Sequence, residues 1–403
     1  MSPLQLGLLK SVSGQEGNQM CAGIKLLPIR VFIFLCFLIV CSCSRQDKQA
    51  IIVKIDLDGE LLKTISSKSI FADISIIPLD DSVIVTNGSY SSPSSIALGD
   101  DVFYVLDERS FAIDIFDYSG KFIGLIGHVG RGPGEYNLAQ GIFLDKENST
   151  IEVLDPTGRI FKYSTEHGGD LKGVLDLRQK LHAANDVLKL PEQDYLLFSI
   201  SGENKICMYK ALDEDVLGIN LPLPEWQIIY NYVPKPLITD GDKYYFFQSF
   251  DGTLVNLDLK ANRTSTYLYW DFGKYKQSID NIPPGKTAEF YYDYIGENTD
   301  RYASPFIFEG VSNNLVVANF VYRGKPHSLF YHTDTKELHV FYETEERMKF
   351  MPTTIKDGYA FMLVEPDNLD KYVDTSLMDA QSIKLFNERN VHQNSYLIVY
   401  KFK

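Results

Sequence analysis

The chain has 403 residues, of which 45% are hydrophobic and 13% aromatic, so it has enough apolar side chains for a large core and too many for a disordered protein. The formal net charge is −14, which argues against nucleic-acid binding, because that function needs a basic surface to neutralise phosphates. Length alone favours two or three domains, but all-β repeat folds of this size often form a single unit.

The N-terminal region contains a targeting segment. The apolar run Val31–Val40 follows Lys25 and Arg30 and is shorter than the ~20 residues that span a bilayer, a pattern typical of a signal peptide. Ser42 followed by Cys43 resembles the end of a bacterial lipoprotein signal, in which the cysteine is acylated. We therefore predict a signal peptide over residues 1–43 with lipid attachment at Cys43; an ordinary secretory signal is the alternative.

The start of the mature chain follows from this assignment. The polar leader Met1–Gln19 is explained as a start-site artefact if translation begins at Met20. Residues 44–50 are polar and are predicted to form a tether between the lipid and the folded domain. Cys207 is then the only other mature cysteine, so no intrachain disulfide is expected and the core must stabilise the fold.

From residue 102 onward, short runs rich in Val, Ile, Phe and Tyr alternate with turns of Gly, Asp and Asn, as in antiparallel sheet. The pattern recurs about every 40 to 55 residues, the length of a four-stranded propeller blade. The six copies lie near Ser94–Ile126, Leu138–Leu177, His182–Leu221, Val233–Phe272, Ser304–Glu343 and Phe350–Lys403.

These repeats predict an all-β fold: a six-bladed β-propeller of four-stranded antiparallel blades over residues 51–403. Neighbours packed around a ring bury both faces of each blade, and closing the ring protects the sheet edges. The N-terminal strands in Ile51–Thr86 are expected to join the last blade and close the ring. A two-layer β-sandwich is the alternative, but it predicts no regular recurrence.

Two insertions interrupt the repeats, near residues 274–301 and 366–394. The second has a partial apolar stripe at helical spacing, which predicts a short helix over Ser376–Glu388. Insertions of this kind tend to cover one face of a propeller, and loops on rigid scaffolds carry function more often than strands do.

The glycine-rich loop Gly127–Tyr136 is the most distinctive stretch. A phosphate-binding loop is disfavoured, because no Gly-Lys-Ser/Thr follows and no helix begins there. We favour a bend between the outer strand of one blade and the inner strand of the next, which glycine permits. The alternative is that Arg131, Glu135 and Tyr136 project into the ring opening and contact a ligand.

Asp117–Ile126 followed by Gly130–Tyr136 resembles the signature of a family of six-bladed β-propeller lipoproteins of Bacteroidetes, distantly similar to NHL-repeat propellers. The later blades are too divergent to add to the resemblance. It implies the propeller fold and a lipid-anchored protein of the bacterial cell envelope, at the outer membrane on its periplasmic or surface side. It implies little about activity, because most members have no established one.

An aromatic cluster in the first insertion provides a second set of candidate ligand-binding residues. Tyr292 and Tyr294, with Arg301 and Trp270 nearby, form a possible stacking surface for sugar rings. The alternative, which we favour, is a cap whose aromatic side chains pack onto the propeller.

Catalytic signatures are absent from the sequence. It has no HExxH, CxxC or GxSxG, so no catalytic residue, metal site or cofactor is predicted. The histidines do not recur at one repeat position and are expected at the surface; they are His128, His167, His182, His327, His332, His339 and His392.

These features predict a non-catalytic ligand- or protein-binding or scaffold module, held at the membrane by its N-terminal lipid. Its expected partner is an envelope protein or a glycan, for example in outer-membrane nutrient import, and the propeller itself is expected to be monomeric. The alternative is a hydrolase or lyase with its active site in the central channel. That alternative predicts several His, Asp or Glu side chains converging there.

Overall fold

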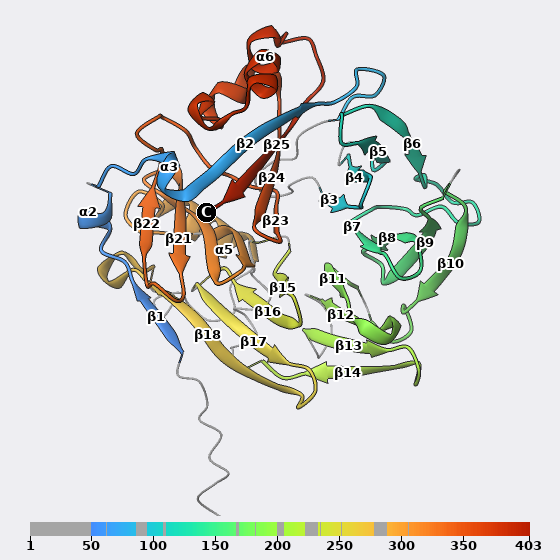
Figure 1. Cartoon of the computed structure of the whole chain (residues 1–403). Coiled ribbons are helices and arrows are strands. Elements are labelled where there is room, and N and C mark those ends of the chain that lie inside the picture. Colours follow the sequence, from blue (N-terminus) through green and yellow to red (C-terminus); the bar gives the residue numbers. More distant parts are fainter. Residues whose placement is uncertain are drawn as a thin grey trace, which may run out of the picture. The chain divides into compact units, whose positions relative to one another are not determined.

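The strands form six sheets arranged in a ring, so the predicted six-bladed β-propeller is confirmed (Figure 1). The four strands of each blade pair antiparallel and follow chain order outwards from the centre, except in the last blade, and blade 4 has an additional parallel strand. The computed structural model describes residues 50–61, 63–85, 95–107, 110–166, 169–181, 183–199, 205–221, 233, 235–250, 252–277, 288–304 and 306–403.

Each blade coincides with one of the predicted repeats. Blade 1 comprises β3 (Ser95–Leu98), β4 (Val102–Leu106), β5 (Ile113–Asp117) and β6 (Phe122–Ile126). Blade 2 comprises β7 (Gly141–Asp145), β8 (Thr150–Asp155), β9 (Arg159–Ser164) and β10 (Leu171–Asp176). Blade 3 comprises β11 (Asp186–Lys189), β12 (Tyr195–Phe198), β13 (Ile206–Lys210) and β14 (Asp215–Ile219).

The second half of the ring contains both the longest and the shortest of the described strands. Blade 4 comprises β15 (Leu237–Asp240), β16 (Lys243–Gln248), β17 (Thr253–Asp258) and β18 (Arg263–Asp271). Blade 5 comprises β19 (Phe306–Ser312), β20 (Leu315–Tyr322), β21 (Lys325–His332) and β22 (Leu338–Phe341). Blade 6 comprises β23 (Thr354–Lys356), β24 (Tyr359–Val364), β25 (Tyr396–Phe402) and β2 (Phe71–Pro78).

Alternation along the strands lets each blade pack against two neighbours. On β4, Phe103 and Val105 belong to the apolar cluster shared with blade 6, whereas Tyr104 and Leu106 belong to the cluster shared with blade 2. Successive side chains of a strand point to opposite faces, so a continuous apolar run serves two interfaces. In the described ranges, one such cluster fills each space between neighbouring blades.

The ring is closed by β2, which pairs antiparallel with β25. Ile74 lies opposite Tyr400, and Ile76 lies opposite Ile398. A strand from the N-terminal part of the chain thus becomes the outermost strand of the last blade, beside the segment that ends the sequence (Figure 1). The predicted ring closure is confirmed for this strand.

The other N-terminal strand, β1 (Ile51–Lys54), does not join the last blade, and for it the prediction was wrong. It pairs in parallel with β18 as a fifth strand of blade 4, with Val53 opposite Trp270. The outer strand of a blade presents unpaired backbone N–H and C=O groups that a further strand can satisfy. Val53 and Ile55 are buried in the cluster between blades 4 and 5, which holds this segment there.

The predicted helix of the second insertion is present as α6 (Ala380–Glu388). Asp379 caps its N-terminus by accepting a hydrogen bond from the Ser382 backbone N–H at 2.7 Å. The Ser382 hydroxyl accepts a bond from the Ile76 N–H of β2 at 3.4 Å. This insertion therefore covers the strand that closes the ring.

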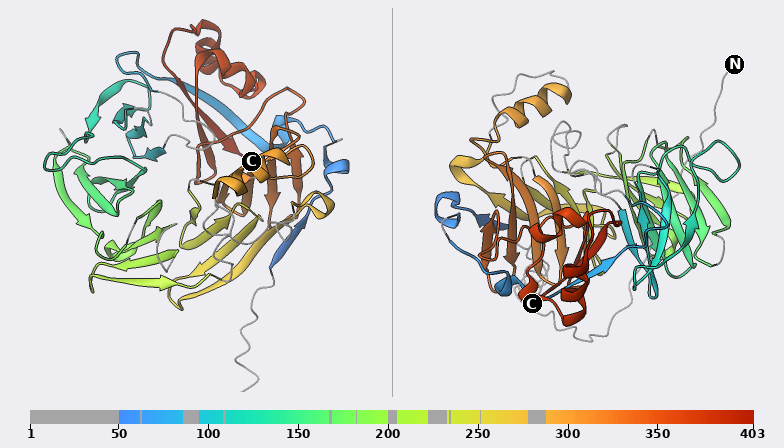
Figure 2. Two further views of the ribbon diagram at one scale, coloured as in Figure 1. Left: turned by 180° about the vertical axis from the view of Figure 1, so that it is seen from behind. Right: turned by 90° about the horizontal axis from the view of Figure 1, so that it is seen from above.

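The remaining helical segments are short, and α5 projects from one face of the ring (Figure 2). Within the ranges given above, no helix is long and apolar enough to cross a membrane. The α-helices are α2 (Leu57–Glu60), α3 (Ser67–Ile70) and α5 (Ala288–Glu297), and the 3-10 helices are η1 (Pro191–Gln193), η2 (Gly273–Tyr275), η3 (Pro366–Lys371) and η4 (Thr375–Leu377).

Replacing Phe71 should test how strongly β2 holds the ring closed. The Phe71 ring is fully buried, with its centre 5.2 Å from that of Phe350, 5.4 Å from Tyr400 and 5.8 Å from Phe402. We expect Phe71→Ala to lower the free energy of unfolding by about 3–5 kcal/mol, through lost packing and a residual cavity. Urea unfolding followed by tryptophan fluorescence measures this change.

The matched control is Leu212→Ala, because Leu212 is 94% exposed in the turn after β13. Its effect should stay within about 0.5 kcal/mol. Equal effects of the two substitutions would contradict the assigned role of β2.

Candidate functional site: the central channel

The innermost strands of all six blades surround a cavity of about 220 Å³ at the centre of the ring. Its wall is mainly apolar, because these strands carry β-branched and aromatic side chains. One apolar lining residue from each blade, in chain order, is Ile96, Ile142, Val187, Ile238, Val311 and Ile355. Concave, mostly apolar cavities with a few polar groups are the usual form of small-molecule sites.

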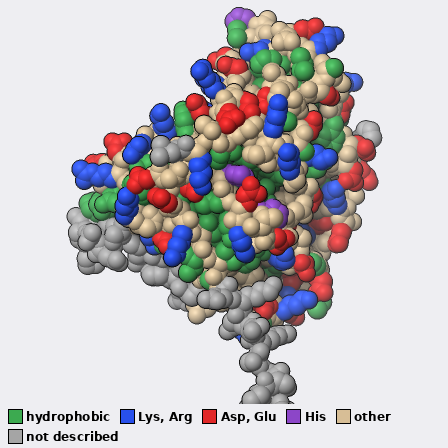
Figure 3. All heavy atoms as spheres, turned by 60° about the vertical axis from the view of Figure 1, so that its left-hand side comes forward, with side chains coloured by type: hydrophobic (Ala, Val, Ile, Leu, Met, Phe, Trp, Pro, Cys, Tyr) green, Lys and Arg blue, Asp and Glu red, His purple; other side chains and the backbone are tan. Residues whose placement is uncertain are grey.

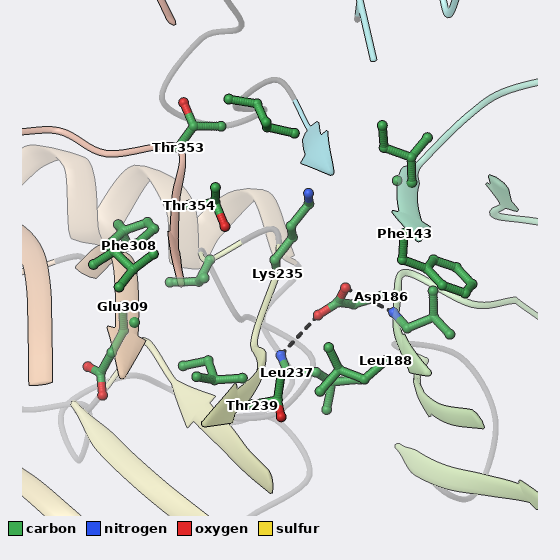
Figure 4. Close-up of a pocket in the computed structure, with 18 of the residues that line it drawn as sticks. Phe143, Asp186, Leu188, Lys235, Leu237, Thr239, Phe308, Glu309, Thr353 and Thr354 are labelled. Atoms are coloured by element: carbon green, nitrogen blue, oxygen red, sulfur yellow. Dashed lines mark hydrogen bonds between the residues drawn. The ribbon is translucent and has the colours of Figure 1, made fainter. Parts of the chain in front are cut away.

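Asp186 is a charged residue built into this wall. It begins β11, and its Oδ1 accepts a hydrogen bond from the Val187 N–H at 2.9 Å. Its Oδ2 accepts a second bond from the Leu237 N–H of β15, also at 2.9 Å (Figure 4). The carboxyl group therefore links the inner strands of blades 3 and 4 and occupies a fixed position at the cavity.

The Asp186 carboxyl titrates close to neutral pH. Burial raises its pKa to about 7, because a charged carboxylate loses hydration inside the protein. The Leu237 N–H, the positive charge of Lys235 and the Val187 N–H all lower the pKa, but burial outweighs them. Both protonation states are thus populated at physiological pH.

Lys235 supplies the positive charge of the channel. It lies just before β15, is half-buried, and extends its side chain into the cavity (Figure 4). Its amino group extends away from the Asp186 carboxyl, but both residues line the cavity near the boundary between blades 3 and 4 (Figure 4). Such side chains can orient a bound molecule through charge and hydrogen bonding.

Glu309 is the second carboxyl group at the cavity, but its carboxyl is directed away from Asp186 (Figure 4). Its Oε2 accepts a hydrogen bond from Trp270 Nε1–H at 2.9 Å, and its Oε1 has no hydrogen-bond partner among the described residues. Burial raises the Glu309 pKa well above its usual range, because a charged carboxylate would lose its hydration there. Because the Glu309 carboxyl is hydrogen-bonded to Trp270 and is directed away from Asp186, the two carboxyl groups do not form a pair.

The channel is lined by few types of reactive side chain. Its described lining residues include no histidine and no cysteine. Nor does the described part of the chain contain a group of three or more His, Cys, Asp or Glu side chains placed to hold a metal ion. The convergence of ligands expected from a metal-dependent lyase is therefore not found in these residues.

The glycine-rich loop forms a bend outside the cavity wall. Gly127 has φ +68°, and a Cβ there would lie 2.8 Å from the Tyr136 ring, so glycine is required at this position. Glu135 Oε2 accepts a hydrogen bond from the Gly132 N–H at 2.7 Å and braces the loop internally. Arg131 is exposed.

Tyr136 does not contact the channel. It is fully buried in the cluster between blades 1 and 2, and its hydroxyl donates to the Phe111 carbonyl at 2.7 Å. Arg131 and Glu135 do not line the cavity either. The loop therefore has the structural role that we favoured, and burial excludes Tyr136 as a ligand contact.

The predicted aromatic surface does not form around Trp270. Its side chain is 0% exposed, and its ring centre lies 6.3 Å from that of Tyr331. Trp270 lies near the end of β18, where the packing of blades 4 and 5 buries it in their shared cluster. It is thus corrected from a ligand-stacking residue to a core residue.

The other members of that candidate set lie on or after α5, a helix that the sequence pattern did not predict. Tyr294 is half-buried and stacks on Phe290 with ring centres 6.3 Å apart, and Arg301 is exposed. The Tyr292 side chain lies outside the described part of the structure. None of the described members lines the central cavity.

Sequence reasoning missed Asp186, Lys235 and Glu309. A usable signal was present: Asp186 and Glu309 are carboxylates within or beside apolar inner-strand segments, DVLK and FIFEGVS. A charged residue at an inner-strand position must face a neighbouring blade or the channel. Which of these it faces depends on the ring geometry.

A family model described as "Domain of unknown function (DUF4934)" matches residues 51–401, which include all the described strands apart from the last residue of β25. The chain belongs to this family. No curated protein matches this DUF4934 member.

Two solved structures resemble the DUF4934 propeller. One is a protein of Bacteroides fragilis described as exported, with a TM-score of 0.69, 18% identity, and coverage of 87% of this chain and 99% of that chain. The other is a DUF4221 family member from Bacteroides vulgatus, with a TM-score of 0.52, 12% identity, and coverage of 83% of this chain and 97% of that chain. These identities show a shared fold.

The raised Asp186 pKa predicts a measurable pH dependence of stability. Between the ordinary value of 3.8 and about 7, the unfolded chain releases the Asp186 proton while the folded chain retains it. Stability arising from this group is therefore fully present below pH 3.8 and is lost as pH rises through 7. At about 1.4 kcal/mol per pKa unit, the loss is roughly 4 kcal/mol.

Asp186→Asn removes this titration. We expect the variant to become more stable relative to the wild type as pH rises from 4 to 8, by a few kcal/mol in urea unfolding. Asp114, whose pKa is also raised, to about 6, contributes equally to both proteins and cancels in the difference. Parallel stability curves for the two proteins would show that Asp186 ionises freely.

Proposed function

We propose that this chain is a non-catalytic binding module of the bacterial cell envelope that holds a small ligand in its central channel. The observation that carries the proposal is the mainly apolar cavity of about 220 Å³, whose lining includes the charged side chains of Asp186 and Lys235. The rigid six-bladed ring supports a scaffold or binding role, because it fixes the lining residues without the ligand's help.

The lining defines the chemistry of the ligand. An apolar body would bury its surface against the aliphatic wall, while one polar group would pair with Lys235 or the Asp186 carboxyl. The volume limits the enclosed part to a small molecule or to one ring of a larger one. A glycan end or a small envelope metabolite meets these requirements.

A hydrolase or lyase acting in the channel is the competing proposal. The Asp186 pKa of about 7 favours it, because a group that titrates near the working pH can both accept and donate a proton. A binding module predicts that the retained molecule is recovered unchanged, whereas an enzyme predicts conversion that disappears in Asp186→Asn.

Filling the channel tests both proposals. Thr354→Trp places an indole in the cavity lining, whereas Thr335→Trp adds the same group at an exposed position after β21. The proteins are incubated with a small-molecule extract of bacterial envelopes, washed, and analysed by mass spectrometry. We expect the wild type and Thr335→Trp to retain the same molecule, and Thr354→Trp to retain at least tenfold less.

Equal retention by all three proteins would place binding outside the channel. Recovery of a chemically altered molecule from the wild type, but not from Asp186→Asn, would replace the binding module with the enzyme.

The envelope location and the lipid anchor are part of the proposal. Cys43 lies outside the described residues, and support for the anchor comes from the apolar run before it and from the family resemblance. Association with outer-membrane nutrient import rests on that resemblance alone. The predicted monomer, and its envelope protein or glycan partner, belong to the same proposal.

Cys43→Ala should release the protein from membranes, because acylation of its sulfur is the proposed attachment. Fractionation of cells expressing the wild type and the variant, with detection of the propeller in the membrane and soluble fractions, measures the change. Replacing the other mature cysteine, Cys207→Ala, is the control, since Cys207 is buried between blades 2 and 3. Membrane retention of Cys43→Ala would refute the anchor.

A further inference from the structure

A second cavity, of about 420 Å³, opens at the rim of blade 5, away from the channel. It lies between the β20–β21 turn, the chain after β22 and the segment after α2. We call it the rim cleft; its main side chains are Arg323, Lys325, His327, Tyr342, Glu343 and Glu345. His327, predicted at the surface, is instead 5% exposed, and its ring packs against that of Phe320 at 5.4 Å.

Aromatic rings hold three cationic side chains here: Arg323 and Lys325 line the cleft, and Lys349 lies beside it, near the Tyr342 ring. Lys325 Nζ lies 4.8 Å from the centre of the Tyr342 ring, and Lys349 Nζ lies 4.7 Å from the same ring. Arg323 Cζ lies 5.0 Å from the centre of the Tyr322 ring. Cation–π contacts of this kind position a charge without neutralising it.

The charge of Arg323 helps to lower the pKa of the Asp58 carboxyl, but the two side chains do not form an ion pair. In the described structure, none of Arg323, Lys325 and Lys349 forms an ion pair within 4.0 Å. Acidic and basic side chains are interspersed on the face that carries α2, β21 and β22 (Figure 3). Nearby lysines use such carboxylates: Lys63 pairs with Glu60 at 2.7 Å, and Lys274 pairs with Asp58 at 2.7 Å.

The absence of pairing stands out on a chain with a formal net charge of −14. Glu343 and Glu345 line the same cleft and are exposed, yet neither is within ion-pair distance of the three cations. In the described structure, the three positive charges at and beside the cleft therefore have no ion-pair partner. Their mutual repulsion is a cost that a bound anion would remove.

The backbone conformation of the β20–β21 turn does not favour an arginine at residue 323. Arg323 has φ +52° and Gly324 has φ +65°, a two-residue hairpin in which asparagine or glycine is the easier choice at the first position. An arginine there accepts an unfavourable backbone conformation and places its guanidinium at the cleft.

We propose that the rim cleft binds a doubly charged oxyanion, a phosphate or sulfate group, through Arg323, Lys325 and Lys349. The planar guanidinium of arginine matches two oxygens of such a group, and lysines act as point charges beside it. Three cations exceed what one carboxylate would neutralise, which favours a dianion. The cleft volume also admits a sugar or glycerol unit that carries the anion.

Isothermal titration calorimetry at low salt tests the proposal with three probes: inorganic phosphate, glucose 6-phosphate compared with glucose, and vesicles containing phosphatidic acid. We expect glucose 6-phosphate to bind and glucose not to bind. Binding of the soluble phosphates without vesicles identifies a small-molecule ligand, whereas binding of vesicles alone identifies a lipid headgroup; either outcome supports an oxyanion site.

Substitutions of two lysines test the site, and a substitution of a third lysine is the control. Lys325→Gln and Lys349→Gln should each weaken the binding that the wild type shows by about tenfold, the loss expected for one charge-assisted contact. Lys401→Gln is the control, because Lys401 also lies near a tyrosine, 6.0 Å from the Tyr359 ring centre, but Tyr359 does not line the cleft, whereas Tyr342 does. Glu343→Gln should strengthen binding by removing a like charge.

Failure of the wild type to bind any of the three probes would overturn the proposal. So would equal weakening in Lys401→Gln, because that result would reflect net charge rather than the cleft. The Thr354→Trp channel variant should bind these probes as the wild type does, so the rim cleft and the channel are tested separately.

Discussion

No single blade of this protein can bury both of its faces, and the rest of the structure depends on that constraint. Each central strand carries apolar side chains on both sides, as β4 does with Phe103 and Tyr104. One face is covered only when a blade packs against its neighbour, and the last face only when the ring closes. The pairing of β2 with β25 is therefore the contact on which all the inter-blade packing depends.

Much of the fold could be predicted from local patterns. Turns such as Asp117–Gly120 and Asp155–Gly158, set between β-branched and aromatic runs, located the blades, because side-chain hydrogen bonds and positive φ are properties of adjacent residues. The parallel pairing of β1 with β18 was not predictable in this way. It joins segments far apart in the chain, and nothing in Ile51–Lys54 specifies its partner.

The candidate site was much less predictable than the fold. Trp270 and Tyr136 are conspicuous in the sequence but fully buried, because packing between blades decides which aromatic faces remain accessible. Asp186 and Lys235 are inconspicuous, and they acquire their role only because β11 and β15 are adjacent around the channel. A sequence pattern predicts which side chains of one strand are buried, whereas a site is formed by side chains from several strands.

The origin of β2 and β25 at opposite ends of the propeller sequence has a consequence for how the protein reaches its folded state. During synthesis β2 emerges first and has no partner until β25 has been made. In the interval the apolar side chain of Phe71, which will pack against Phe350 and Phe402, remains open to water. Contacts between segments so distant in sequence form slowly, and partly folded chains with exposed apolar surface are prone to aggregate. For this ring, the closing contact is also the step most exposed to misassembly, and chaperone protection would matter most before it forms.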